Sequence, residues 1–316
     1  MPQGDIDLGV NVGGIAMKNP IATASGCGGY GEELAEFYDL GLLGAIVTKS
    51  VTREPREGHP PPRLAEVRAG MLNAIGLANV GIERFLAEKL PALARFDVPV
   101  IVNVAGSTPE EYVEVCAALD AADGVAGIEL NVSCPNVKRG GMEFGVAPEP
   151  LAALVEAVRP KVTRAALLVK LSPNVTDIAV TARAAADAGA DALSLVNTLR
   201  GMAVDPWTGR PALTNMVGGL SGPAIKPVAI YMLRRVWEEV AGPRGMAILG
   251  LGGVQFPEDV LEFLRAGATA VSVGTANFVD PRTCVTLVDG VRRGLARLGL
   301  ARVNDLVGCI ETGGEA

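Results

Sequence analysis

Short apolar runs alternate along the chain with longer segments in which apolar residues recur at helical spacing. This alternation is typical of repeated βα units. The expected strands are 20–24, 45–49, 100–104, 127–131, 167–171, 192–197, 247–250 and 270–273. The expected helices are 32–41, 80–94, 109–122, 148–159, 175–188, 223–240, 257–266 and 281–298. Eight strands with eight helices predict an α/β fold of the TIM (β/α)8 barrel type.

Three further segments complete the predicted architecture. Residues 8–10 and 15–17, joined by Gly13 and Gly14, predict an N-terminal hairpin that plugs the bottom of the barrel. Residues 50–79 and 199–221 are connections too long for simple loops, and each follows a strand end. Long connections in compact domains are usually lids or binding loops. We therefore expect long loop insertions at the C-terminal face, where barrel enzymes carry their sites.

The composition agrees with a large buried core. The 316 residues are 49% hydrophobic and only 4% aromatic, and small and β-branched side chains dominate. Such residues suit parallel strands that are buried on both faces and covered by helices. The length also allows two smaller domains. The regular βα rhythm favours one domain over residues 1–316.

Charge and cysteine usage narrow the class of protein. The formal net charge is -7, which argues against nucleic acid as a partner. No signal peptide and no membrane-spanning run is recognisable, so we expect a cytoplasmic, reduced protein without a membrane contact. The cysteines include no C-x-x-C pair and predict neither disulfides nor a metal or iron-sulfur site in this chain. They are Cys27, Cys116, Cys134, Cys284 and Cys309.

Cys134 is the strongest candidate for proton chemistry. It follows the strand 127–131 within a cluster of amide and hydroxyl side chains. The chain has one histidine, His59, so groups that titrate near neutral pH are few. The alternative is that Cys134 only fills a core position, as unpaired cysteines often do.

Polar side chains and glycines stand at the ends of the predicted strands. In a barrel these ends meet at one mouth. Glycines after the last two strands could present backbone N–H groups to a phosphate, although paired glycines also serve plain turns. Strand ends that turn polar on reaching solvent would explain part of the set. The positions are Ser25, Lys49, Asn103, Asn131, Lys170, Asn197, Gly252, Gly253, Gly274 and Thr275.

Two lysines and three asparagines suggest the kind of ligand. Lys170 lies inside an apolar strand, where an ammonium needs an anion or an electron-rich ring, and Lys49 invites the same interpretation. Both could instead extend to the barrel rim. Asn73, Asn131 and Asn197, which precedes Thr198, offer uncharged donors and acceptors. These amides suit a ring with alternating C=O and N–H groups, such as a pyrimidine.

A competing motif is G-x-G-x-x-G at residues 26–31, which would fit a dinucleotide-binding fold. The next strand ends in Lys49 where that fold places a ribose-binding acid, and six more strands follow. We interpret these glycines as letting the backbone approach a flat ligand over the first strand.

At these residues the chain resembles the class 1 dihydroorotate dehydrogenases, and more narrowly the NAD-linked class 1B catalytic subunits. The resemblance covers nearly the whole chain. Its motifs are NPIATASG (19–26), VTKSVT (47–52), GMLNAIGL (70–77), NVSCPNV (131–137), VKLSPNVTD (169–177), NTLRGM (197–202), GGLSGPAI (218–225) and GLGG (250–253). His59 stands where asparagine is more usual, outside the matched functional positions.

The resemblance implies an FMN-dependent oxidation of (S)-dihydroorotate to orotate in pyrimidine biosynthesis. Cys134, with Lys49 beside it, would be catalytic, and Cys134 would take the C5 proton while the C6 hydride passes to flavin N5. FMN would contact Ser25, Lys49, Ser50, Asn103, Asn131, Lys170, Val196, Gly222, Gly252, Gly253, Gly274 and Thr275. Substrate would contact Lys49, Asn73, Ala74, Ile75, Gly76, Leu77, Asn131, Asn197 and Thr198.

The resemblance also implies partners. Electrons would reach NAD through a separate subunit with FAD and a [2Fe–2S] cluster, and a homodimer of this chain would bind two copies of it in a heterotetramer. Three alternatives stay open. They are a flavin barrel that reduces uracil or thymine, a fumarate-linked class 1A homodimer, and a non-catalytic barrel that binds a phosphorylated ligand.

Overall fold

The computed structural model describes residues 6–132 and 144–311. Its centre is an eight-stranded parallel sheet in the order β3-β14-β13-β10-β9-β8-β7-β4. A parallel bridge between Ala22 and Ala45 joins the two outer strands and closes the barrel. The strands are β3 (Ile21–Thr23), β4 (Ile46–Val47), β7 (Val100–Val104), β8 (Val125–Asn131), β9 (Ala166–Lys170), β10 (Ala192–Leu195), β13 (Ala247–Leu251) and β14 (Ala270–Val273). The predicted TIM barrel is confirmed.

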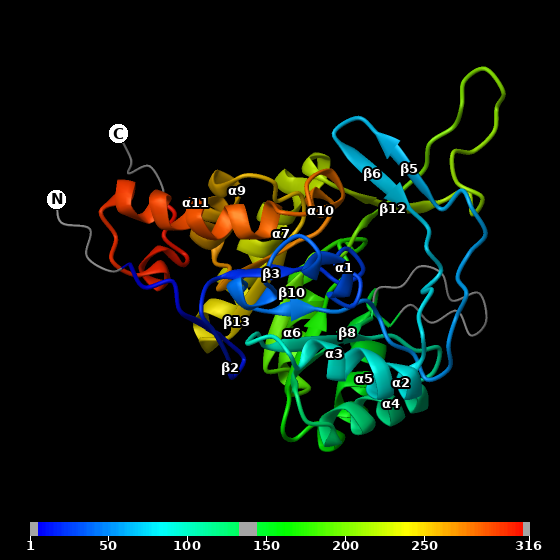
Figure 1. Cartoon of the computed structure of the whole chain (residues 1–316), viewed down its shortest axis with the longest axis horizontal. Helices are drawn as coiled ribbons and strands as arrows, with labels where there is room; N and C mark the ends of the chain where they lie inside the picture. The colour runs from blue at the N-terminus through cyan, green and yellow to red at the C-terminus, as the bar shows by residue number, and fades with distance from the viewer. Residues whose placement is uncertain (1–5, 133–143, 312–316) are drawn as a thin grey trace.

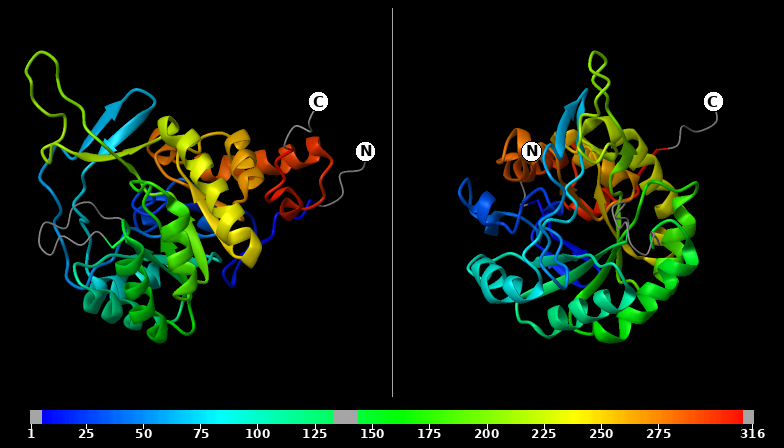
Figure 2. Two further views of the ribbon diagram at one scale, coloured as in Figure 1. Left: turned by 180° about the vertical axis from the view of Figure 1, so that it is seen from behind. Right: turned by 90° about the vertical axis from the view of Figure 1, so that its right-hand side faces the viewer.

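Helices surround the barrel strands (Figure 1 and the right view of Figure 2). Several begin with proline or end at glycine, as helix termini prefer. Pro109 opens α4 after the Thr108 cap, and Gly299 ends α11 in the left-handed conformation. The α-helices are α1 (Glu32–Ala35), α2 (Ile82–Arg84), α3 (Leu90–Leu93), α4 (Pro109–Ala121), α5 (Pro148–Val158), α6 (Ile178–Asp187), α7 (Lys226–Val236), α8 (Gly242–Arg244), α9 (Pro257–Ala266), α10 (Ala276–Val279) and α11 (Thr283–Leu298).

Three predicted helices differ in detail. The segment predicted at 32–41 is only the four-residue α1 followed by the 3-10 turn Leu40–Leu42. The segments at 80–94 and 223–240 contain the π-helical stretches Phe85–Lys89 and Trp237–Ala241. Apolar spacing predicts a helical face but does not distinguish these hydrogen-bond patterns, because all of them repeat at close to four residues.

The N-terminal hairpin is present, with β1 (Val10–Val12) and β2 (Ile15–Met17) joined by Gly13 and Gly14. Both glycines have positive φ, as a tight hairpin turn requires. Gly13 lies against Asp191 and Ala192 at the start of β10, and Ile15 packs on Gly127 in the first half of β8. The hairpin therefore covers the N-terminal end of the barrel, opposite the mouth.

The two long insertions are not loops throughout, which corrects the expectation from sequence. They form one four-stranded antiparallel sheet in the order β11-β12-β6-β5. Its strands are β5 (Leu64–Val67), β6 (Gly70–Asn73), β11 (Leu199–Gly201) and β12 (Gly218–Ser221). The sheet projects from one end of the barrel (Figures 1 and 2) and has its own small core of Leu72, Ala74 and Leu213. Pairing of β6 with β12 brings both insertions over the same mouth.

The barrel core depends on close packing of helices on small strand residues. Phe263 of α9 and Leu233 of α7 lie directly over Gly250 of β13, and both side chains are fully buried. A side chain at position 250 would collide with them.

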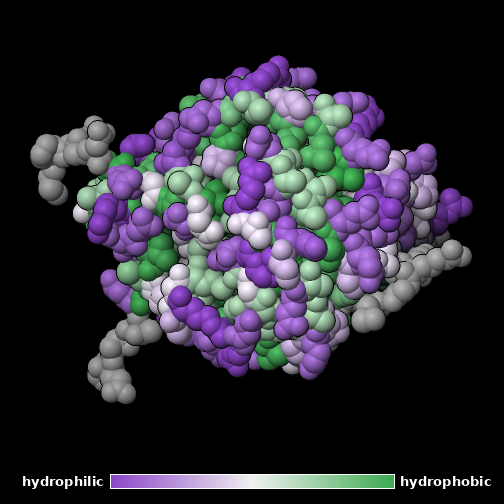
Figure 3. All heavy atoms as spheres, turned by 90° about the horizontal axis from the view of Figure 1, so that it is seen from below, coloured by the Kyte–Doolittle hydropathy of each residue, from purple (hydrophilic) through white to green (hydrophobic). Residues whose placement is uncertain are grey.

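The surface carries both hydrophilic and hydrophobic residues. Figure 3 shows them interspersed on the face that it presents. Nowhere in the described ranges is a helix long and apolar enough to span a bilayer.

Phe263→Ala is expected to lower the free energy of unfolding by about 3–5 kcal/mol, because it leaves a cavity over Gly250. Urea unfolding followed by circular dichroism measures the loss. Phe256→Ala is the matched control, since Phe256 precedes the same helix and is 58% exposed. Equal losses in the two variants would contradict this account of the core.

Candidate active site

One cavity opens at the C-terminal ends of the barrel strands. Its volume is about 410 Å³. Ser25 follows β3, Lys49 follows β4, Asn131 ends β8 and Lys170 ends β9, and all four line it. Parallel strands bring their ends together, so residues far apart in sequence meet here. The gathering predicted from the strand ends is observed for these residues.

Most of the residues singled out from sequence line this cavity. Asn103, Ala74 and Gly76 do not, and Asn103 and Ala74 are buried behind it. Cys134 lies outside the described residues. Those that line the cavity are Ser25, Lys49, Ser50, Asn73, Ile75, Leu77, Asn131, Lys170, Val196, Asn197, Thr198, Gly222, Gly252, Gly253, Gly274 and Thr275.

Lys170 brings a buried positive charge to the cavity. Its side chain is 5% exposed, and its ammonium lies 3.9 Å from Oε1 of Glu129, whose side chain is 1% exposed. Nζ also donates a 2.9 Å hydrogen bond to Ser25 Oγ. A buried ammonium is strongly unfavourable without such partners. The Lys170 ammonium is thus fixed at the cavity wall by an ion pair and a hydrogen bond, and it does not extend to the barrel rim.

Asn103 acts from behind the wall. Its Nδ2 donates to Glu129 Oε1 at 2.6 Å, and its Oδ1 accepts a hydrogen bond from Ser50 Oγ. Asn103 is fully buried, whereas Ser50 lines the cavity. A continuous polar chain therefore runs from Ser50 through Asn103 and Glu129 to Lys170 and Ser25.

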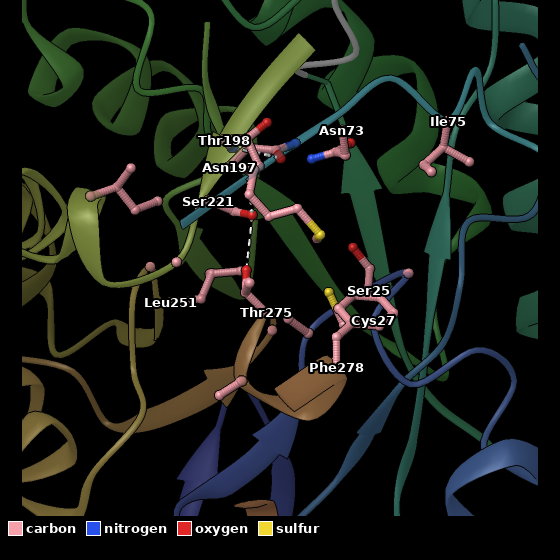
Figure 4. Close-up of a pocket in the computed structure, with 18 of the residues that line it drawn as sticks. Ser25, Cys27, Asn73, Ile75, Asn197, Thr198, Ser221, Leu251, Thr275 and Phe278 are labelled. Carbon is pink, nitrogen blue, oxygen red and sulfur yellow. Dashed lines mark hydrogen bonds between the residues drawn. The ribbon is translucent and has the colours of Figure 1, made fainter. Parts of the chain in front are cut away.

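Amide side chains form a second part of the cavity wall. Asn197 Nδ2 donates to Asn131 Oδ1 at 3.2 Å, and Asn73 Nδ2 donates to the carbonyl of Gly219 at 3.0 Å. Figure 4 shows Asn73, Asn197 and Thr198 grouped together, across the cavity from Ser25 and Cys27. The insertion sheet supplies Asn73 from β6, so the sheet completes the site that the barrel begins.

Backbone without side chains forms the third part of the wall. Gly222, Gly252 and Gly253 have φ values of 95°, 135° and 83°, which favour glycine. A Cβ on Gly253 would lie 2.8 Å from the carbonyl oxygen of Gly222. Thr275 Oγ1 donates to Ser221 Oγ at 2.8 Å beside them (Figure 4). The cradle leaves room for a ligand group to approach the backbone closely.

Lys49 is the second cation of the cavity. Burial lowers its pKa, the nearby Arg63 guanidinium lowers it further, and the Glu33 carboxylate raises it. Arg63 also lines the cavity. Two cations that face one space favour an anionic ligand, because their mutual repulsion is relieved when a negative charge binds.

Several lining or supporting residues were missed from sequence. Glu129 had a usable signal, since an acid inside the apolar run GIELN needs a buried partner. Arg63, Met71 and Phe278 had none, because the first insertion brings Arg63 and Met71 to the cavity and the short helix α10 brings Phe278. Cys27 also lines the cavity. Burial raises its pKa to about 11, with a smaller lowering effect of Lys170, so Cys27 is a poor base near neutral pH.

The glycines at 26–31 divide into two roles. Gly26 lines the cavity, has φ 82° and would meet no atom within 4 Å of an added Cβ. Gly31 instead precedes the short α1, and a Cβ there would strike Leu93. The first glycine therefore leaves open space over β3, as the flat-ligand interpretation expected. The barrel excludes the dinucleotide-binding fold for this motif.

A closed barrel with a cation-lined, amide-lined site at its C-terminal mouth defines the chain as a TIM-barrel enzyme. Residues 7–295 match the model of the family described as dihydroorotate dehydrogenase. The chain belongs to the dihydroorotate dehydrogenase family, and the family inferred from its motifs is confirmed.

Similar proteins carry a more specific name, "Dihydroorotate dehydrogenase B (NAD(+)), catalytic subunit". The one from Pelobacter propionicus is 53% identical over 305 residues, which are 96% of this chain and 99% of that protein. The one from Geobacillus kaustophilus is 54% identical over 301 residues, 95% of each chain. That of Bacillus caldolyticus is 53% identical with the same coverage.

Thiol reactivity should follow burial among the described cysteines. Cys309 is exposed, whereas burial raises the pKa of Cys27 to about 11 and that of Cys284 to about 12. Iodoacetamide at about pH 8 is expected to label Cys309 at least about tenfold faster than either, because the thiolate is the nucleophile. Peptide mass spectrometry over time measures the order, with Cys309→Ser as control. Labelling of Cys27 as fast as Cys309 would contradict the buried site.

Proposed function

We propose that this chain oxidises (S)-dihydroorotate to orotate, as the class 1B catalytic subunit of a dihydroorotate dehydrogenase in pyrimidine biosynthesis. The observation that carries the proposal is the buried ammonium of Lys170 at the wall of a cavity that also holds neutral amides. The family membership and the names of the relatives support the same reaction.

FMN fits the cavity as the resident cofactor. The volume of about 410 Å³ lies in the range of small-molecule sites. Gly222, Gly252 and Gly253 form a cradle that a Cβ would fill, which suits a phosphate. Lys170 would stand beside the ring, where a cation stabilises negative charge. When bound, FMN supplies the hydride acceptor for C6 of the substrate.

The remaining predicted FMN contacts fall into two groups. Ser25, Ser50 and Asn131 offer side-chain hydrogen bonds at the strand ends, and Asn103 acts through Ser50. Others provide backbone or small contacts and are proposed as part of the same site. They are Val196, Gly274 and Thr275, together with Lys49 at the boundary to the substrate.

Dihydroorotate would bind between the amides and Lys49. Asn73, Asn131 and Asn197 can pair with the alternating C=O and N–H groups of the ring. Thr198 lies beside them, and Ile75 and Leu77 line the cavity while Ala74 and Gly76 shape the backbone between. Lys49 and Arg63 face the space as cations, which suits the substrate carboxylate.

Cys134 is proposed as the base that removes the C5 proton. It follows Asn131, which ends β8 at the cavity, by three positions. A free thiol has a pKa of about 8.5, so a base at neutral pH needs support from its surroundings. We propose that Lys49, whose own pKa is lowered by burial, supplies this support as a positive charge.

Cys134→Ala is expected to keep bound FMN and to lose about 10²–10⁴ of turnover, the range of a general base. The measurement is FMN absorbance together with dihydroorotate oxidation by an artificial acceptor. Cys309→Ala, an exposed thiol, is the control and should retain full activity. A colourless wild-type chain, or full activity in Cys134→Ala, would refute the proposal.

The choice of substrate distinguishes the proposed function from the three alternatives. A uracil- or thymine-reducing barrel binds a ring without a carboxylate, so the pair of cations at Lys49 and Arg63 favours dihydroorotate. A fumarate-linked enzyme would turn over with fumarate alone. A non-catalytic barrel would bind FMN without oxidising any dihydropyrimidine.

We also propose that electrons leave through a partner subunit that holds FAD and a [2Fe–2S] cluster and reduces NAD. The name of the relatives, a catalytic subunit, supports a partner. No group of three or more metal-binding side chains is found across residues 6–132 and 144–311. The proposed assembly is a homodimer of this chain with two partner copies. One FMN-binding domain over residues 1–316 and a cytoplasmic location stay predictions.

An affinity-tagged chain in its native host is expected to retain a flavoprotein with an iron-sulfur cluster at about equal amounts. Mass spectrometry, FAD content and iron content of the purified complex measure this. The complex, and not the isolated chain, should reduce NAD with dihydroorotate. NAD reduction by the isolated chain, or turnover of fumarate by it, would contradict the proposed partner.

A further inference from the structure

The most deeply buried charge near the cavity belongs to Glu129, which lies behind the wall. We infer that Glu129 is a positioning residue that balances the Lys170 ammonium and fixes which way two cavity hydroxyls, Ser25 and Ser50, point their hydrogen atoms. The inference rests on the proposed function only because its first test needs FMN bound in the cavity.

The geometry around Glu129 is that of a counter-ion with one shared oxygen. Its Oε1 accepts from Asn103 Nδ2 at 2.6 Å and lies 3.9 Å from Lys170 Nζ. Glu129 contributes the one acidic group within 4 Å of that ammonium in the parts of the chain that the structure describes. A buried ammonium is strongly unfavourable without such a counter-ion.

The same carboxylate fixes the orientation of Asn103. An ionised carboxylate only accepts hydrogen bonds, so the amide must turn its NH₂ group toward Glu129. Oδ1 of Asn103 then faces Ser50 and accepts the Ser50 hydroxyl hydrogen. Ser50 is left with lone pairs toward the cavity and acts there as an acceptor.

Ser25 receives the opposite polarity. Lys170 Nζ donates to Ser25 Oγ at 2.9 Å, so one lone pair of that hydroxyl is used and its own hydrogen is available to donate. Ser25 and Ser50 both line the cavity. The single carboxylate of Glu129 thus makes the Ser25 hydroxyl a donor and the Ser50 hydroxyl an acceptor. A ring with both C=O and N–H groups can form hydrogen bonds with both.

Two titratable groups of the described residues face Lys170. Glu129 approaches from β8, and Cys27 approaches from the segment after β3. The Cys27 thiol stays uncharged near neutral pH because burial raises its pKa to about 11. Glu129 is therefore the charged group that balances the Lys170 ammonium.

The test is Glu129→Gln in the full-length FMN-loaded chain, which keeps the side-chain shape and removes the charge. The probe is sulfite, whose lone pair adds to flavin N5 and leaves the ring negatively charged. The quantity is the ratio of the sulfite dissociation constants of variant and wild type, measured by flavin bleaching from about pH 6 to about pH 9. The ratio cancels the titration of sulfite itself.

The expected ratio differs from one. Without the Glu129 carboxylate the Lys170 ammonium faces the cavity with no nearby anion to offset it, so the variant should bind sulfite about tenfold more tightly than wild type. A ratio near one across this range would overturn the inference.

The matched control is Asp120→Asn. Asp120 is also a buried carboxylate, but it accepts hydrogen bonds from the backbone of Arg164 and Ala165 before β9, at the other end of the barrel. Its sulfite ratio should stay near one at every pH. A shift as large as that of Glu129→Gln would show that loss of any buried carboxylate disturbs the cavity, which contradicts a specific role for Glu129.

A second measurement does not depend on FMN. Urea unfolding of the apo chain is compared for Glu129→Gln, Lys170→Met and the double variant. Partners in a buried pair should be coupled, so the double variant should lose less stability than the sum of the single losses. Additive losses would overturn the inference. If the stability losses are additive but the wild-type chain still oxidises dihydroorotate, only the role of Glu129 is wrong. If the losses are coupled but the wild-type chain binds no FMN, only the proposed function is wrong.

Discussion

A lysine ammonium buried at the end of an apolar barrel strand is the constraint on which the described site depends. Lys170 has to be balanced by a carboxylate and hydrogen-bond acceptors, because its side chain is only 5% exposed. One connected chain of Glu129, Asn103, Ser25 and Ser50 meets that need. Two of these side chains, Ser25 and Ser50, also line the cavity, so stability and recognition are linked here.

The insertion sheet turns the open mouth of the barrel into a site. β6 from the first insertion pairs with β12 from the second, and Asn73 bonds to the Gly219 carbonyl across them. Close approach depends on small residues, since a Cβ on Gly70 would strike the Ser221 carbonyl. The insertions therefore add Asn73 to the amides that the barrel strands already place at the cavity.

The barrel could be predicted from sequence because its strands are short, apolar and evenly spaced. The strand ends could be predicted for the same reason, and Ser25, Lys49, Asn131 and Lys170 do meet at one cavity. The insertion sheet could not, because β11 and β12 are rich in glycine and lack the alternating pattern of a strand. The position of Asn103 behind Ser50 was also missed, since periodicity does not reveal which polar residue reaches the cavity.

The motifs shared with a known family predicted more of the chemistry than the spacing of residues did. Nothing in composition distinguishes Cys134 from Cys27, yet the structure places Cys27 where burial raises its pKa to about 11 and keeps the thiol protonated near neutral pH. The barrel and the glycine cradle could accept many phosphorylated ligands. Membership of the dihydroorotate dehydrogenase family, together with the amides and cations that line the cavity, supports the ligand proposed above.

The most direct test of the central claim is a crystal structure of the chain with FMN and orotate bound. The account predicts the isoalloxazine ring in the cavity, within hydrogen-bond distance of Lys170 and Ser25, with orotate stacked on it beside Asn73 and Asn197 and the Cys134 sulfur facing C5. A ring bound elsewhere, or Lys170 separated from it by packed hydrocarbon, would contradict the account.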